Sequence, residues 1–187
     1  MSIDSLTLQE IRDIYRQRMK HDFPRNELKP LGMIEKALER GNYLCCGLRD
    51  GGDILAYAFF VLAEDVYMFD YFAVRKDLRG TGIGSGFLKE LCTCHLREAP
   101  CILLEVDDPA FAGSDGEKEV RERRIRFYLR HGLRDTEARA RIFGADFLIL
   151  EYPKGEPCSR EEAGMFYSRI YRCILPKPVY ERMVKIT

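Results

Sequence analysis

The sequence predicts a mixed α/β layer fold, in which a mostly antiparallel central sheet is flanked by helices. Two apolar segments, 43–49 and 54–63, are joined by Asp-Gly-Gly-Asp, which is a strong signal for a β-hairpin. An aromatic-rich segment follows at 66–74, so the three together predict an antiparallel meander. Helical and strand patterns alternate from there on, which is typical of helices packed on a sheet. The 187 residues suffice for one domain that buries roughly 70% of its surface.

Hydrophobic periodicity and breaker residues set the bounds of the other elements. Apolar residues recur near helical spacing over 5–20, where Ser5 or Thr7 is expected to cap the helix, and over 31–40, where Gly41-Asn42 ends it. The remaining expected elements are a helix that opens from a glycine-rich loop and ends near residue 98, a short buried strand at 101–106, a charged helix at 117–131, a hairpin pair at 142–144 and 147–150, and a helix at 160–174.

Composition and charge exclude several classes of protein. Thirty Lys and Arg balance thirty Asp and Glu, and a net charge of zero argues against a general nucleic-acid binder. The longest run without a charged residue is 54–63, ten residues, whereas a membrane span needs about 20. The N-terminal residues show no basic region followed by an apolar one, so no signal peptide is expected. We therefore expect a cytoplasmic protein that binds neither membrane nor nucleic acid.

The seven cysteines favour free thiols in a reducing compartment, because their number is odd and no export signal is visible. Cys92, Cys94 and His95 form the motif CTCH, which suggests metal ligands. No second ligand pair stands at a zinc-finger spacing, and on a helix Cys92 and Cys94 point about 200° apart. We expect buried thiols and no metal.

Four alternating glycines, Gly80, Gly82, Gly84 and Gly86, lie between the third strand and the next helix. Glycine lets backbone N–H groups approach a ligand closely, and a helix N-terminus adds free donors and positive dipole. The loop therefore predicts a phosphate cradle.

The spacing of this loop excludes two familiar phosphate motifs. A Walker A loop fails because no glycine precedes a lysine. A dinucleotide fingerprint would place its third glycine on Ser85 or Phe87, so it fails as well. Glu105 stands at a plausible distance for a ribose-binding acid, which leaves the dinucleotide interpretation open but weak.

The pattern that fits is Arg79-x-x-Gly82-x-Gly84, preceded by Phe72-Ala73-Val74 at the end of the aromatic strand. Here the sequence resembles the GNAT superfamily of N-acetyltransferases, whose signature is Gln/Arg-x-x-Gly-x-Gly/Ala four residues after a strand that ends in an Ala-Val-like pair. The strand ILLEV and the helix ending RFYLRHGL follow in the order that this family shows. The resemblance covers roughly residues 43–150.

The resemblance implies a GNAT domain at 1–150, with substrate-side helices at 1–42 and a CoA-binding core at 43–150, followed by an extension at 151–187. It implies acetyl-CoA as cosubstrate, with the pyrophosphate on the loop N–H groups and the pantetheine arm along the splayed strand end. The residues carried over as cofactor contacts are Phe72, Ala73, Val74, Arg79, Gly80, Thr81, Gly82, Ile83, Gly84 and Ser85.

Acetyl transfer to an amine needs an uncharged nucleophile, a donor for the carbonyl oxygen and a proton for the departing thiolate. Tyr128, four residues before Gly132, resembles the family's helix tyrosine, which implies that it protonates the sulfur. Some members carry a carboxylate at the position of Met68, so the base is less clear here. Asp70 and Glu105 are acids within apolar strands, and we expect either one in the amine site. A base that acts through water would leave neither essential.

Other charged and aromatic segments allow weaker expectations. The acidic run Glu105, Asp107, Asp108 and Asp115 would attract a cationic amine, although a solvated loop explains it as well. Phe23, Pro24 and Glu27 lie where the family places substrate-side helices. The aromatic residues of the extension suggest packing on the domain or on a second subunit, which leaves a homodimer open. They are Phe166, Tyr167, Tyr171 and Tyr180.

These observations predict an N-acetyltransferase that moves the acetyl group of acetyl-CoA to a primary amine, on a small molecule or a peptide, by direct attack in a ternary complex. A different acyl-CoA or acceptor on the same fold is the enzyme alternative. A GNAT-fold module that binds CoA without catalysis, as a sensor or partner domain, is the other alternative, because a fold does not fix a function.

Overall fold

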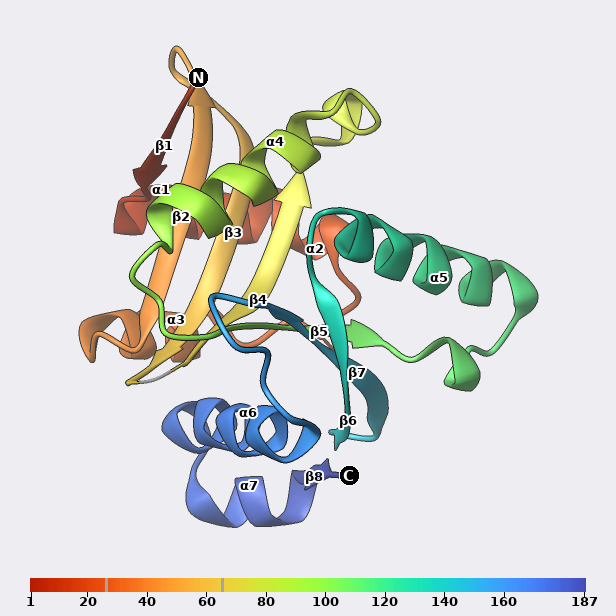
Figure 1. The fold of residues 1–187 in the computed structure, drawn as a ribbon. Helices are drawn as coiled ribbons and strands as arrows, with labels where there is room; N and C mark the ends of the chain where they lie inside the picture. The colour runs from red at the N-terminus through yellow and green to blue at the C-terminus, as the bar shows by residue number, and fades with distance from the viewer. Residues whose placement is uncertain (26, 65) are drawn as a thin grey trace.

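The computed structural model describes residues 1–25, 27–64 and 66–187, and its strands and helices surround one sheet (Figure 1). Within these ranges eight strands pair in the order β1-β2-β3-β4-β5-β7-β6-β8. The strands are β1 (Ser2–Ser5), β2 (Tyr43–Asp50), β3 (Asp53–Ala63), β4 (Val66–Val74), β5 (Ile102–Asp107), β6 (Arg134–Ile142), β7 (Ala145–Tyr152) and β8 (Val184–Ile186). The helices are α1 (Leu8–Ile14), α2 (Lys20–Asp22), α3 (Leu31–Glu39), α4 (Ile83–Glu90), α5 (Asp115–Arg130), α6 (Arg160–Ile174) and α7 (Lys177–Met183).

Strand pairing confirms the predicted fold class. The strands β1 to β4 form an antiparallel meander, and β5, β7, β6 and β8 continue the sheet with antiparallel partners. Among the described strands, β4 and β5 make the one parallel pair. The first helix also forms as expected, and Thr7 caps it in a capping box with Glu10.

The last hairpin differs from the sequence prediction. A strand was expected over 142–144, but β6 begins at Arg134, and Phe143 and Gly144 form the turn. Both turn residues have positive φ, 49° and 90°, as a type I′ hairpin turn requires. The inward side chains of β6 include Thr136, Ala138 and Ala140, which are buried but small or polar, so the alternation is weak in hydropathy.

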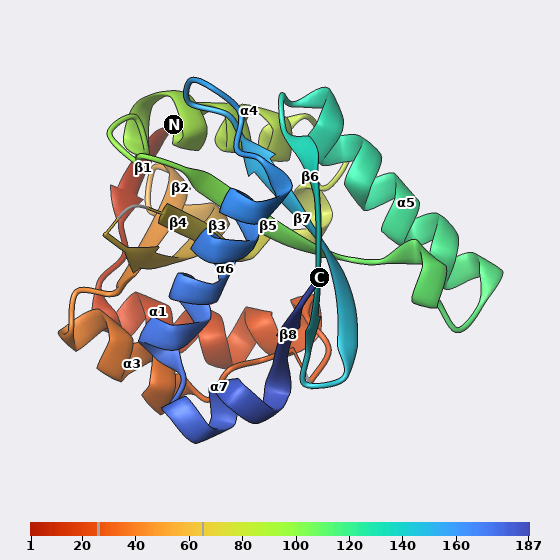
Figure 2. The same cartoon turned by 60° about the horizontal axis from the view of Figure 1, so that its bottom comes forward.

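Helices cover both faces of the sheet (Figures 1 and 2). On one face, α1, α3 and α6 pack in a core cluster that contains Tyr57, Phe59 and Tyr167. On the other face, α4 and the end of α5 pack in a second cluster that contains Phe60 and Phe87. The sheet thus separates two apolar cores, and no helix in the described ranges has the length and apolar character needed to cross a membrane.

The C-terminal extension packs on the domain. Ser159 caps α6 in a second capping box, and the helix contacts β3, β4 and β6. Tyr167 and Tyr171 are among its buried residues. After α7 the chain returns to the sheet as β8, which pairs with β6 (Figure 2).

The central feature of the sheet is the divergence of β4 from β5. Their pairing is confined to residues 67–69 of β4 and 102–104 of β5, so the ends of both strands separate. A bulge in β4 accompanies this divergence: Phe69 pairs with Phe60 and Tyr71 with Phe59, which leaves Asp70 as the extra residue. The side chains of Asp70 and Tyr71 therefore both lie on the face of the sheet that α1, α3 and α6 cover.

Candidate functional site

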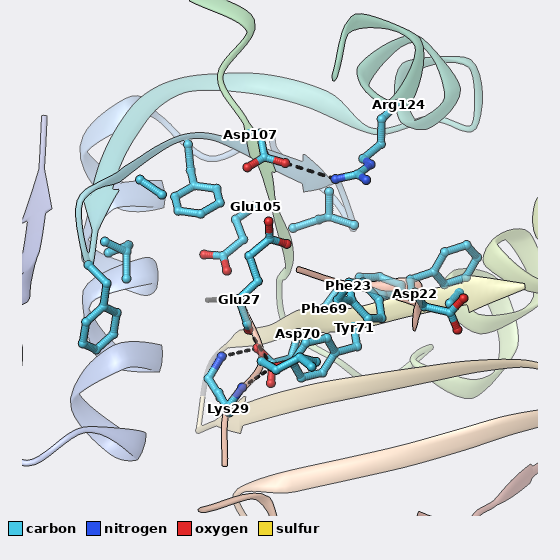
Figure 3. Close-up of a pocket in the computed structure, with 18 of the residues that line it drawn as sticks. Asp22, Phe23, Glu27, Lys29, Phe69, Asp70, Tyr71, Glu105, Asp107 and Arg124 are labelled. Carbon is cyan, nitrogen blue, oxygen red and sulfur yellow. Dashed lines mark hydrogen bonds and ion pairs between the residues drawn. The ribbon is translucent and has the colours of Figure 1, made fainter. Parts of the chain in front are cut away.

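A cavity of about 630 Å³ opens where β4 and β5 diverge (Figure 3). Its walls come from the N-terminal segment around Glu27, the ends of β4 and β5, the helix α5, the β6–β7 turn and α6. The cavity is therefore assembled from segments that span nearly the whole sequence.

The glycine-rich loop adjoins the cavity at the end of β4. Gly82 is the N-cap of α4 with a φ of +91°, and no side chain caps this helix end. The first N–H groups of α4 therefore have no acceptor within the helix. A Cβ at Gly84 would lie 3.1 Å from Val74 Cγ2, so the absence of a side chain lets α4 approach the strand closely. These features fit a phosphate-bearing ligand.

The structure places four of the ten expected cofactor contacts on the cavity wall. Phe72, Ala73, Val74 and Arg79 line it, whereas residues 80–85 lie beside it. Arg79 donates through Nε to the carbonyl oxygen of Val74 at 3.0 Å and forms an ion pair with Asp22. This guanidinium is thus tied to the N-terminal segment at the mouth of the site.

Asp70 lies in the cavity wall with its carboxyl group buried. It forms an ion pair with Lys29 and accepts a hydrogen bond from the Tyr43 hydroxyl. Burial alone would lower the pKa of Lys29, but the nearby carboxylates of Asp70 and Glu105 outweigh it and raise the pKa. The Lys29 ammonium is therefore charged at neutral pH, and both oxygens of Asp70 have donors.

Glu105 is the second buried acid of the cavity. Its carboxylate accepts hydrogen bonds from the hydroxyls of Tyr167 and Tyr171, the latter at 2.8 Å. Burial raises the pKa of Glu105, while Lys29 and the two hydroxyls oppose this rise. The extension thus fixes the carboxylate of this β5 residue in the cavity wall.

Glu27 is a third acid in the cavity wall, and its pKa is strongly raised. Its carboxyl group is directed toward those of Glu105 and Asp107 (Figure 3). Partial burial, followed by repulsion from Asp107, raises the pKa of Glu27 to about 7, and Arg124 opposes the rise. A carboxyl group with this pKa exchanges a proton readily near neutral pH.

Tyr128 lies on α5 and also lines the cavity. Only 7% of the residue is exposed, and burial raises the pKa of its phenol to about 12. Among the described residues, none makes a hydrogen bond to its hydroxyl. This phenol remains protonated and free to donate to a ligand.

Some of the other residues expected at the site line the cavity, and some lie outside it. Phe23 lines it and packs edge-on against Tyr71, with 5.0 Å between ring centroids, while Pro24 does not line it. Asp107 lines it as the ion-pair partner of Arg124 at 3.1 Å. Asp108 instead caps a short 3-10 turn, and Asp115 lies in the first turn of α5.

Three residues were not expected at the site from the sequence: Lys29, and the two tyrosines Tyr167 and Tyr171, which were expected only to pack. Lys29 lies in a loop, 41 positions along the sequence from its partner Asp70. Tyr167 and Tyr171 are more than 60 positions from their partner Glu105. The aromatic cluster of the extension was a usable signal for the two tyrosines, but it does not indicate which acid they meet.

A glycine-rich helix end lies beside the diverging strands and the acid-lined cavity, an arrangement that fits a transferase with a phosphate-bearing donor. The family model described as the acetyltransferase (GNAT) family matches residues 8–133, and the chain belongs to this family. The resemblance drawn from the loop motif is thereby confirmed. Search of the curated proteins finds no match.

Solved structures share the fold. A putative GNAT acetyltransferase from Bacteroides thetaiotaomicron has a TM-score of 0.71 at 18% identity, covering 95% of this chain and 100% of that one. The ribosomal-protein-S18-alanine N-acetyltransferase from Escherichia coli has a TM-score of 0.58 at 21% identity, covering 84% and 96%. A mutant spermidine N-acetyltransferase from Vibrio cholerae has a TM-score of 0.60 at 11% identity, covering 87% and 100%.

Proposed function

We propose that this acetyltransferase moves the acetyl group of acetyl-CoA to a primary amine by direct attack in a ternary complex. The observation that carries the proposal is that one cavity between β4 and β5 is lined by the carboxyl groups of Glu27 and Glu105 and adjoins the Gly82 helix end. Donor and acceptor would meet in this cavity without a covalent enzyme intermediate.

The donor site would use backbone groups more than side chains. The N–H groups of residues 80–85 would hold the pyrophosphate, and residues 72–74 at the unpaired end of β4 would hold the pantetheine arm. The bound thioester supplies an activated acetyl group. Among the described residues, Tyr128 is the phenol in the cavity whose hydroxyl is free to donate, so we assign to it protonation of the departing thiolate.

The acceptor must lose a proton before it attacks, because an alkyl ammonium has a pKa near 10. Glu27 is matched to this task, since its pKa of about 7 lets it accept a proton at neutral pH and release it afterwards. We therefore add Glu27 to Asp70 and Glu105 as a candidate base. Glu105 would hold the ammonium group before deprotonation, and Asp70 would fix Lys29, whose charge stabilises the ionised form of Glu105.

The lining of the cavity favours an amine on a partly apolar body. Phe23, Phe147 and Leu175 supply apolar surface near the carboxyl groups of Glu27 and Asp107. An alkyl or aromatic body would pack on the former, while the ammonium group would face the latter. Two of the structural neighbours are named for acceptors with an amine, an alanine of a ribosomal protein and spermidine. These names support an amine as the class of acceptor.

A panel assay tests the proposal. Release of free CoA from acetyl-CoA would be followed with primary amines of different size, each paired with the alcohol and the carboxylic acid of the same carbon skeleton. We expect turnover with amines and none with their paired alcohols or acids. Tight acetyl-CoA binding without turnover by any amine or peptide N-terminus would favour the binding-module alternative.

A further inference from the structure

A cluster of three metal-ligand side chains lies outside the cavity, where the extension meets the sheet. Cys101 directly precedes β5, Glu151 lies in β7, and Cys158 directly precedes the N-cap of α6. One donor atom from each residue lies within 4.8 Å of the other two. Cys101 and Glu151 are buried, Cys158 is half-buried, and none of the three lines the cavity.

The spacing of the two sulfur atoms fits a tetrahedral zinc ion. The Cys101 and Cys158 Sγ atoms are 3.8 Å apart. Two thiolates bound to zinc at about 2.3 Å with a tetrahedral angle are about 3.8 Å apart, so neither sulfur would need to move far. Two sulfurs and one carboxylate suit zinc, whereas calcium and magnesium prefer sets made of oxygen.

The charges around the cluster also accommodate a divalent cation. Glu151 forms an ion pair with Arg134 at 2.6 Å. Entry of one divalent ion with release of the two thiol protons would leave the net charge of the buried cluster unchanged. A zinc ion bound to two thiolates and one carboxylate forms a complex with a single net negative charge, and Arg134 would balance that charge.

We propose that Cys101, Glu151 and Cys158 bind one zinc ion, with its fourth position open to water. Zinc would replace the two thiol protons, and the Glu151 carboxylate would shift toward the metal while keeping Arg134 as its partner. The ion would fasten the start of α6 to the ends of β5 and β7. Because the same helix carries Tyr167 and Tyr171, the metal would stabilise the extension in the position that the site requires.

Zinc binding is measured on the full chain, stripped with a chelator and kept in a non-thiol reductant. Zinc is titrated against a chromophoric chelator, with magnesium as a second probe, and cobalt is used to detect thiolate-to-metal charge transfer. We expect one zinc per chain, no competition by magnesium, and a thiolate–cobalt band. Cys101→Ser and Cys158→Ser should each weaken zinc binding by more than roughly 100-fold, the upper range for loss of a mere supporting group. Cys94→Ser, which changes an exposed thiol elsewhere, should bind as the wild type does.

A measurement on the unmodified chain keeps the test valid if a serine variant fails to fold. Alkylation followed by peptide mass spectrometry should show that zinc protects Cys101 and Cys158 and leaves Cys94 reactive. Equal reactivity of the two thiols with and without zinc would overturn the proposal, as would a Cys101–Cys158 disulfide that persists in the reductant. Wild-type zinc affinity in a folded Cys101→Ser or Cys158→Ser chain would overturn it as well. None of these readouts depends on acetyl transfer, so they stand apart from the proposed activity.

Discussion

Replacement of Glu27 by Gln removes the carboxyl group that would transfer the proton and keeps the size and shape of the side chain. With a pKa of about 7, roughly one-tenth of Glu27 is ionised at pH 6, so wild-type kcat/KM should fall about tenfold per pH unit below this pKa. Glu27→Gln should remove that inflection and lower kcat/KM by about 10² to 10⁴ at pH 8, the usual contribution of a general base. The assay is CoA release with a turned-over amine between pH 5.5 and 9.

The same variant should have the opposite effect on stability. The pKa of Glu27 is raised in the fold from its ordinary 4.5 to about 7, so the folded chain keeps a proton that the unfolded chain releases. The stability from this proton is present below about pH 4.5 and is lost as the pH rises through about 7. Glu27→Gln lacks this loss, so its Tm should rise relative to wild type between pH 5 and pH 8. Glu156→Gln, at an exposed position, is the matched control and should change neither profile.

Two results would refute the reasoning about Glu27. A folded Glu27→Gln chain with wild-type kcat/KM and an unchanged inflection would show that another group or a water chain accepts the proton. Reduced activity with the inflection retained would assign the inflection elsewhere, and Glu105 would become the next residue to substitute.

Three further perturbations address the donor, the acid and the extension. Tyr128→Phe should lower kcat and kcat/KM together by about 10² to 10⁴ while acetyl-CoA affinity, measured by calorimetry, stays unchanged; wild-type turnover would make Tyr128 a packing residue. Gly84→Asp should abolish acetyl-CoA binding, because the new Cβ would meet Val74 and the new charge would repel a pyrophosphate. Acetyl-CoA at 100-fold its Kd should stabilise the wild type by about 2.7 kcal/mol and should not stabilise the variant. Tyr171→Phe removes one donor to Glu105 and should shift the pH profile of kcat/KM with little change in acetyl-CoA affinity; an unchanged profile would limit Tyr171 to packing.

The sequence predicts what local chemistry determines. The hairpin over 43–63, the uncapped glycine-rich start of α4 and the cap at Thr7 all depend on neighbouring residues, and they were found in the expected places. The strand β6 was missed over most of its length because Ala138 and Ala140 face the core with little hydrophobic contrast to their neighbours. The strands β1 and β8 are four and three residues long, too short for a periodic pattern.

The candidate site was predicted only in part because its charges are set by partners distant in sequence. Asp70 and Glu105 could be singled out, since an acid within an apolar strand needs a partner. Their partners could not be identified, because Lys29 and Tyr167 meet them only after both ends of the chain have packed on the same face of the sheet. The pKa of Glu27 is likewise a tertiary property, which depends on burial and on Asp107 and Glu105.

The positions of Asp70 and Glu105 also connect the two ends of the chain to the proposed reaction, because each acid is held by a residue from one end. Lys29 forms an ion pair with Asp70, and its charge opposes the protonation of Glu105. Tyr171 donates to Glu105, and the Lys29 ammonium lies 5.9 Å from the centroid of its ring. Moving either the Lys29 loop or α6 would therefore leave Glu105 with fewer stabilising partners, and the pKa of its carboxyl group would rise further. The ionised state of Glu105 that the proposed acetyl transfer needs thus depends on the N-terminal loop and the extension being docked together.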